Sequence, residues 1–211
     1  VLCALGMTAN GTHGNTLSQM EEVFGMPIGE LNEYLYTYVK KLPMGKNYKI
    51  KIANSMWFEE TVTGLKRSFL QMNADYYKGD IYTFSSEGPV VQDINLWVSE
   101  KTDGMIKDIL DEGDGGEEVF LVNALAFHSE WQEIYREDQV KKGVFTMEDG
   151  QKQDAIMMYS TEGLYLEDEK AEGFVKYYAD QKYAFAALLP EKGVSISEYV
   201  STLTGRRLMD I

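Results

Sequence analysis

The sequence is poor in cysteine, histidine and proline, and each shortage argues against a class of protein. Its 211 residues include one cysteine, two histidines and four prolines. Cys3 has no partner for an internal disulfide, which excludes a disulfide-stapled scaffold. His13 and His128 lie far apart and have no cysteine or carboxylate at ligand spacing, so we expect no metal site. No Pro- or Ser-rich linker interrupts the chain, which favours one domain over residues 1–211.

Basic residues and long apolar runs are also scarce. The chain has 20 basic against 34 acidic residues and a net charge of −14, so we expect neither nucleic acid nor a membrane surface as partner. No apolar run approaches the roughly 20 residues that span a bilayer. The sequence starts inside an apolar segment without a recognisable signal peptide, and it ends without a terminating signal. We expect both ends to be cut points in a longer protein.

The motifs of enzymes are missing as well. The chain contains no Gly-x-Ser-x-Gly elbow and no Walker-type or dinucleotide-binding glycine loop. The acidic segment Asp111–Glu117 fails the spacing of a helix-loop-helix calcium site, so we interpret it as a solvated loop. These observations predict a protein that is not an enzyme and that uses no cofactor.

The pattern of apolar residues indicates an α+β protein. Helical spacing predominates in the first half, including residues 28–42 and 90–110, and a strand is predicted over Tyr48–Phe58. After Trp131 the pattern changes to short strands, with a hairpin turn at Ala179–Lys182. The fold class predicted is therefore helices packed on a sheet, followed by a strand-rich part.

One segment, Val119–Phe127, is apolar at every position except Asn123. A run without alternation is typical of a strand covered on both faces, so we predict a central strand here. An amide within such a strand must find a hydrogen-bond partner or cost about 1–3 kcal/mol. We therefore expect Asn123 to bond to a specific group across the sheet, whether as a satisfied core residue or as part of a functional site.

Several stretches of the sequence, taken together and in order, resemble the serpin family. They are Val1–Met20, Ala53–Phe58, Ile94–Ile106, Leu121–Trp131, Phe145–Met158 and Tyr183–Pro190. The resemblance implies a partial serpin fold, with N-terminal helices packed on a large β-sheet and strands of two smaller sheets. It covers roughly the first half or more of a serpin, less the family's first strand and helix. The reactive loop and the C-terminal strands are absent from the chain.

The resemblance also implies a mechanism and two site residues. A serpin is a suicide inhibitor: a target serine or cysteine protease attacks the reactive loop, and the cleaved loop inserts into the large sheet. In that scheme the Val119–Phe127 strand borders the gap that receives the loop. Asn123 belongs to the polar cluster that holds the gap shut, and Trp131 lies where the loop enters. By the same resemblance, we expect an extracellular location.

The alternative reading is a non-inhibitory serpin-like protein that acts through binding or as a chaperone. The composition of the hinge would separate the two, since small residues permit insertion. A hydrolase is disfavoured by the missing nucleophile motifs. Because it has no reactive loop, we expect the 211-residue chain alone to inhibit no protease. We also expect the exposed strand edge to promote self-association or to accept a complementing polypeptide.

Overall fold

The structure, a computed structural model, describes residues 1–43, 45 and 48–211. Contacts divide the chain into two compact units, Val1–His128 and Ser129–Ile211, and each is described by itself. The first unit contains, in order, α1 (Leu2–Ala9), α2 (Gly14–Phe24), α3 (Ile28–Lys41), β1 (Tyr48–Glu59), α4 (Arg67–Tyr77), β2 (Asp80–Phe84), α5 (Val90–Lys101), a short 3-10 turn (Glu112–Asp114) and β3 (Val119–Ser129), which ends at the boundary.

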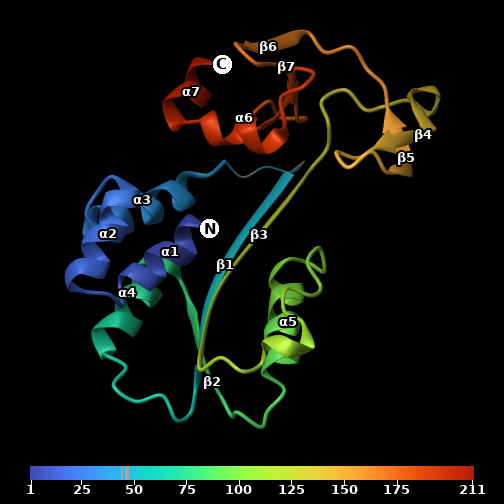
Figure 1. Cartoon of the computed structure of the whole chain (residues 1–211). Helices are drawn as coiled ribbons and strands as arrows, with labels where there is room; N and C mark the ends of the chain where they lie inside the picture. The colour runs from blue at the N-terminus through green and yellow to red at the C-terminus, as the bar shows by residue number, and fades with distance from the viewer. Residues whose placement is uncertain (44, 46–47) are drawn as a thin grey trace. The chain divides into compact units, whose positions relative to one another are not determined.

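The first unit is built on a sheet with strand order β2-β1-β3, in which β1 and β2 are parallel. The strand predicted over Tyr48–Phe58 is confirmed as β1. Successive side chains of β1 point to opposite faces of the sheet and enter two different hydrophobic clusters. Trp57 packs in a cluster with α5, whereas Met56 and Phe58 pack in a cluster with α1, α3 and α4. Figure 1 shows α5 on one side of β1 and β3, and α1 to α4 on the other.

The strand predicted over Val119–Phe127 is confirmed as β3, but the prediction that it is central, with both faces covered, is wrong for this chain. Its burial alternates: Phe120, Val122, Ala124 and Ala126 are buried. Residues between them are more open, and Leu125 is 56% exposed. The buried face packs against α5, and in the described sheet β3 has β1 on one side and no strand on the other.

The helix predicted over residues 90–110 ends at Lys101. Asp103 and Gly104 take left-handed backbone conformations with φ of 54° and 75°, which a continuing helix does not allow. Beyond them the chain folds back onto α5, where Asn95 Oδ1 accepts hydrogen bonds from the N–H groups of Ile109 and Leu110 at 2.9 and 3.1 Å. The Asn95 side chain thus accepts the N–H groups of Ile109 and Leu110, which would bond to backbone oxygens if the predicted helix continued to residue 110.

The second unit is strand-rich, as predicted. It contains a 3-10 turn (Glu137–Gln139), β4 (Val140–Thr146), β5 (Lys152–Met158), β6 (Leu164–Asp168), β7 (Ala171–Tyr177), β8 (Ala184–Pro190), α6 (Ile196–Thr202) and α7 (Gly205–Asp210). β4 and β5 form an antiparallel pair, and β6, β7 and β8 form an antiparallel sheet in that order. Asp168 at the end of β6 accepts hydrogen bonds from Tyr199 of α6 at 2.8 Å and from Arg207 of α7 at 2.7 Å.

None of the helices described is long and apolar enough to cross a membrane. No group of three or more His, Cys, Asp or Glu side chains in the described part of the chain is arranged to hold a metal ion.

Candidate functional site

Asn123 is tied across the sheet, as the sequence predicted. From β3, its Nδ2 donates a hydrogen bond to Oδ1 of Asn54 in β1 at 2.8 Å. Asn54 is buried, and its own Nδ2 donates to the backbone oxygen of Tyr77 at 2.7 Å. Asn123 therefore connects β3 through β1 to the end of α4.

A buried polar network continues from this connection into the helices. The Tyr77 hydroxyl donates to Asn32 Oδ1 at 2.7 Å, and Asn32 and Asn10 exchange side-chain hydrogen bonds. Asn10 also donates to Asn73 Oδ1 at 3.0 Å. Burial raises the pKa of Tyr77, which keeps its hydroxyl protonated as a donor. The sequence predicted only the Asn123 end, because the other members lie on α4, on α3 and at the end of α1, and no sequence motif links them.

The register of β1 and β3 shows which backbone groups of β3 point away from the sheet. The N–H of Glu59 donates to the oxygen of Glu118 at 2.8 Å, and five residues further along β3, Asn123 meets Asn54. The two strands are therefore antiparallel, and Glu59 and Glu118 form a hydrogen-bonded pair. Because such pairs alternate with non-hydrogen-bonded ones, Leu121 and Asn123 direct their N–H and C=O groups away from β1.

Trp131 belongs to the second unit, where it packs against aromatic side chains of the β7–β8 hairpin. Its ring stacks on Tyr178 with centroids 4.5 Å apart and an interplanar angle of 8°, and it meets the edge of Phe185 at 6.0 Å. Trp131 and Tyr178 form an antiparallel bridge, and the N–H of Gln132 donates to the oxygen of Tyr177 at 3.0 Å. Trp131 therefore packs on Tyr178 and Phe185, which flank the hairpin turn predicted around Ala179–Lys182.

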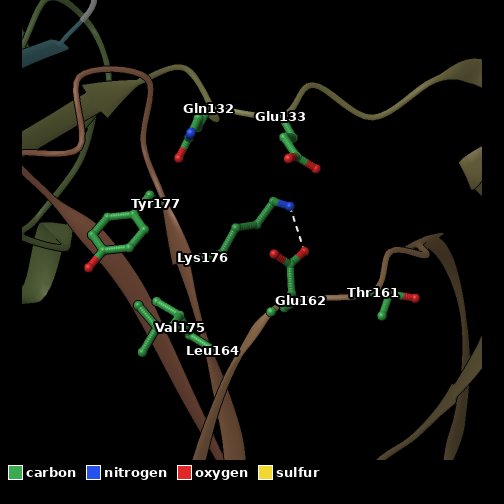
Figure 2. A pocket seen from close by; sticks show the side chains of 9 residues that line it. Gln132, Glu133, Thr161, Glu162, Leu164, Val175, Lys176 and Tyr177 are labelled. Atoms are coloured by element: carbon green, nitrogen blue, oxygen red, sulfur yellow. Dashed lines mark hydrogen bonds and ion pairs between the residues drawn. The ribbon is translucent and has the colours of Figure 1, made fainter.

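A buried ion pair beside Trp131 was not predicted. Lys176 of β7 is buried, and its Nζ lies 2.6 Å from Glu162 Oε1. The same ammonium group lies 4.7 Å from the ring centroid of Tyr135 and 5.7 Å from that of Trp131, within the range of cation–π attraction. Figure 2 shows the ion pair among side chains that line a pocket. The pocket has a volume of about 160 Å³ and is lined by Gln132, Glu133, Thr161, Glu162, Gly163, Leu164, Val175, Lys176 and Tyr177.

The ion pair shifts the titration of both of its members. Hydrogen bonds from Lys176 and from Ser160 hold the pKa of Glu162 below its usual value. Burial opposes the charge of Lys176, but its interactions with Glu162 and Tyr135 together outweigh burial and raise the pKa of Lys176. Both groups are therefore charged across the neutral range. A lysine between Val175 and Tyr177 is the sequence feature that could have indicated a buried charge at this position.

Comparison with known protein families identifies the class of this chain. It matches the family model of the serpins, serine protease inhibitors, over residues 1–211. The chain belongs to the serpin family.

Individual relatives agree with this assignment. Human (Homo sapiens) Serpin B9 is 28% identical over 217 residues that cover 97% of this chain and 57% of the relative. The native structure of the thermophilic serpin tengpin matches with a TM-score of 0.90 and 45% identity, covering 99% of this chain and 55% of that one. The structure of a loop C-sheet serpin polymer matches with a TM-score of 0.87 and 45% identity, over 99% and 55% of the two chains. This chain spans about half the length of these relatives. Its fold is confirmed as α+β and as part of a serpin fold.

Proposed function

We propose that the intact protein is a suicide inhibitor of serine or cysteine proteases that acts by inserting a cleaved reactive loop beside β3. Membership of the serpin family supports the inhibitory class. The outward edge of β3 supports the mechanism, since Leu121 and Asn123 direct backbone groups to a side with no strand in the described sheet. An extended segment adds to such an edge through main-chain hydrogen bonds, and serpin loop insertion is a known example of this strand addition.

Asn123 and Trp131 have separate parts in this proposal. The bond from Asn123 to Asn54 connects β3 to β1, so separating β3 from β1 breaks it. Asn123 thereby restrains the position of the strand that borders the insertion gap. Trp131 and its aromatic neighbours Tyr178 and Phe185 form the apolar surface at which the loop begins to insert. Both roles are carried over from the family by the match of Leu121–Trp131.

The inhibitory class is tested by incubating the intact protein with trypsin, subtilisin and papain. We expect a covalent complex with at least one of them that survives denaturing electrophoresis, because the acyl-enzyme is trapped. The 211-residue chain should form none, since it contains no segment resembling the hinge and reactive loop. Proteases with a chemically blocked nucleophile are the matched control.

Two results would contradict the proposal. Cleavage of the intact protein by all three proteases without any stable complex would identify a non-inhibitory serpin that acts by binding. A stable complex formed by the 211-residue chain would show that the assumed role of the reactive loop is wrong.

The same edge of β3 favours association with another polypeptide. An edge strand with unsatisfied backbone groups is a template for pairing with a second chain. In the 211-residue chain we therefore propose self-association through β3. The partners of the intact protein are proteases, and by family resemblance they would be met outside the cell.

A further inference from the structure

The sequence contains one Asn-Gly pair, Asn10-Gly11, which lies at the end of α1. An asparagine followed by glycine is prone to spontaneous deamidation, because glycine has no Cβ to shield its backbone nitrogen or to restrict rotation of the chain. The Gly11 nitrogen attacks Cγ of Asn10 and loses its proton, the Cγ–Nδ2 bond breaks, and ammonia leaves. Water then opens the succinimide ring to aspartate or isoaspartate. Asn10 is therefore the asparagine of this chain with the highest intrinsic reactivity.

The fold engages every group that this reaction uses. Nδ2 of Asn10 donates to Oδ1 of Asn32 at 3.2 Å and to Oδ1 of Asn73 at 3.0 Å, and Oδ1 of Asn10 accepts from Asn32 at 2.9 Å. The N–H of Gly11 donates to the backbone oxygen of Thr8 at 2.9 Å. The backbone of Asn10 is helical, with φ −61° and ψ −19°, and ring closure requires it to leave that conformation. Cyclisation therefore requires the end of α1 to separate from α3 and α4.

Deamidation changes what the side chain at position 10 offers to its partners. The product carboxylate is ionised at neutral pH and only accepts hydrogen bonds. It would face Oδ1 of Asn32 and Oδ1 of Asn73, which are also acceptors and belong to buried residues. The two hydrogen bonds donated by Asn10 cannot re-form, and a buried acceptor that loses its donor costs free energy. The contact of α1 with α3 and α4 therefore does not return to its original state.

We propose that Asn10 is a deamidation site that the native contacts of α1 with α3 and α4 keep closed and that local opening of these contacts exposes. Proteins open locally with free energies below that of global unfolding, so the reaction proceeds from an open form within the native population. The deamidated fraction then records how often the contact has opened, and it removes those molecules from the native population. This modification site is independent of the proposed inhibitory function.

The first test compares the reaction in the folded and the unfolded chain. The 211-residue chain is incubated at mildly alkaline pH in buffer and in urea, and conversion of Asn10 is followed by peptide mass spectrometry. Enzymatic methylation of isoaspartate measures the product independently. We expect Asn10 to deamidate at least about tenfold more slowly in the folded chain, because only the open form reacts.

Tyr77→Phe weakens the closed form without changing Asn10. It removes the hydroxyl that donates to Asn32 Oδ1 at 2.7 Å, and Asn32 exchanges hydrogen bonds with Asn10. We expect Asn10 to deamidate about fivefold faster in this folded variant, the effect of one lost hydrogen bond on the opening equilibrium. Tyr76→Phe is the matched control, because its hydroxyl donates to Glu33 at 2.8 Å outside the network. In urea the wild type and both variants should react at equal rates.

Asn10→Asp reproduces the charge of the product and provides a readout that does not depend on Tyr77→Phe. It should lower the urea midpoint of unfolding, whereas Asn15→Asp, the same change at an exposed position of α2, should not. The proposal is overturned by equal deamidation rates in the folded and unfolded chain, by equal effects of the two tyrosine substitutions on that rate, or by an Asn10→Asp chain as stable as the wild type.

Discussion

Replacing Glu162 by Gln is expected to lower the free energy of unfolding of the second unit by about 2–3 kcal/mol. The substitution leaves the Lys176 ammonium buried without its carboxylate, and an uncompensated buried charge costs more than a lost neutral hydrogen bond. This value lies at or below the lower end of the roughly 3–5 kcal/mol that breaking a buried ion pair costs, because the pair borders a pocket and water can reach the site. Urea unfolding followed by tryptophan fluorescence measures the effect, since Trp131 lies beside Lys176.

Glu133→Gln is the matched control for this substitution. Glu133 lines the same pocket and is exposed, and it forms no ion pair in the described part of the chain. The change in charge is the same, so its effect should stay within about 0.5 kcal/mol. Equal stabilities of the Glu162 and Glu133 variants would show that the ion pair contributes nothing specific.

The Glu162–Lys176 ion pair also predicts how the stability difference between wild type and Glu162→Gln depends on pH. Because the folded-state pKa of Glu162 is lowered, its contribution is present above the unfolded pKa of about 4.3 and is lost as pH falls through the folded value. The raised pKa of Lys176 acts at the other end, so its contribution is lost only as pH rises through that value. The gap between wild type and Glu162→Gln should therefore be constant near neutrality and close below about pH 4.

Gly173→Ala should destabilise the same unit by about 3 kcal/mol, the upper end for overpacking. Gly173 lies in β7, and a Cβ placed there would overlap the backbone oxygen of Ala187 in β8. A backbone oxygen in a paired strand cannot rotate away, so β7 and β8 must separate locally and lose ladder hydrogen bonds. The aromatic face that holds Trp131 lies on this hairpin, so near-ultraviolet circular dichroism should change as well.

Gly163→Ala provides the comparison within the same unit. No atom lies within 4 Å of a Cβ added at Gly163, and its backbone is outside the left-handed region. That variant should unfold within about 0.5 kcal/mol of the wild type. If both alanine variants had the same stability, the close contact between β7 and β8 would not constrain the hairpin.

The sequence predicted those features that depend on local pattern. Alternation along Tyr48–Phe58 placed β1, and the isolated amide of Asn123 in an apolar run predicted a partner across the sheet, which is Asn54. Burial on both faces of β3 could not be judged from pattern alone. The same apolar residues fit a strand with two buried faces or a strand with one buried and one half-exposed face. Which of the two forms depends on the elements that pack on each face.

Long-range polar pairs were beyond sequence reasoning for a different reason. Glu162 and Lys176 lie in separate parts of a hairpin, and nothing in their spacing indicates that one buried charge meets the other. The Asn10–Asn32–Asn73 cluster likewise depends on how three helices pack. Residues of the same types lie on the surface elsewhere in the chain, so residue type does not distinguish them.

Amide hydrogen exchange along β3 in the 211-residue chain tests the strand-accepting edge most directly. In dilute solution the amides of Leu121 and Asn123 should exchange at least about tenfold faster than those of Phe120 and Val122, which point toward β1. Raising the protein concentration should slow Leu121 and Asn123 while leaving the other two unchanged, as a second strand pairs with the edge. Equal protection of all four amides, unaffected by concentration, would contradict an open edge on β3 and the insertion mechanism built on it.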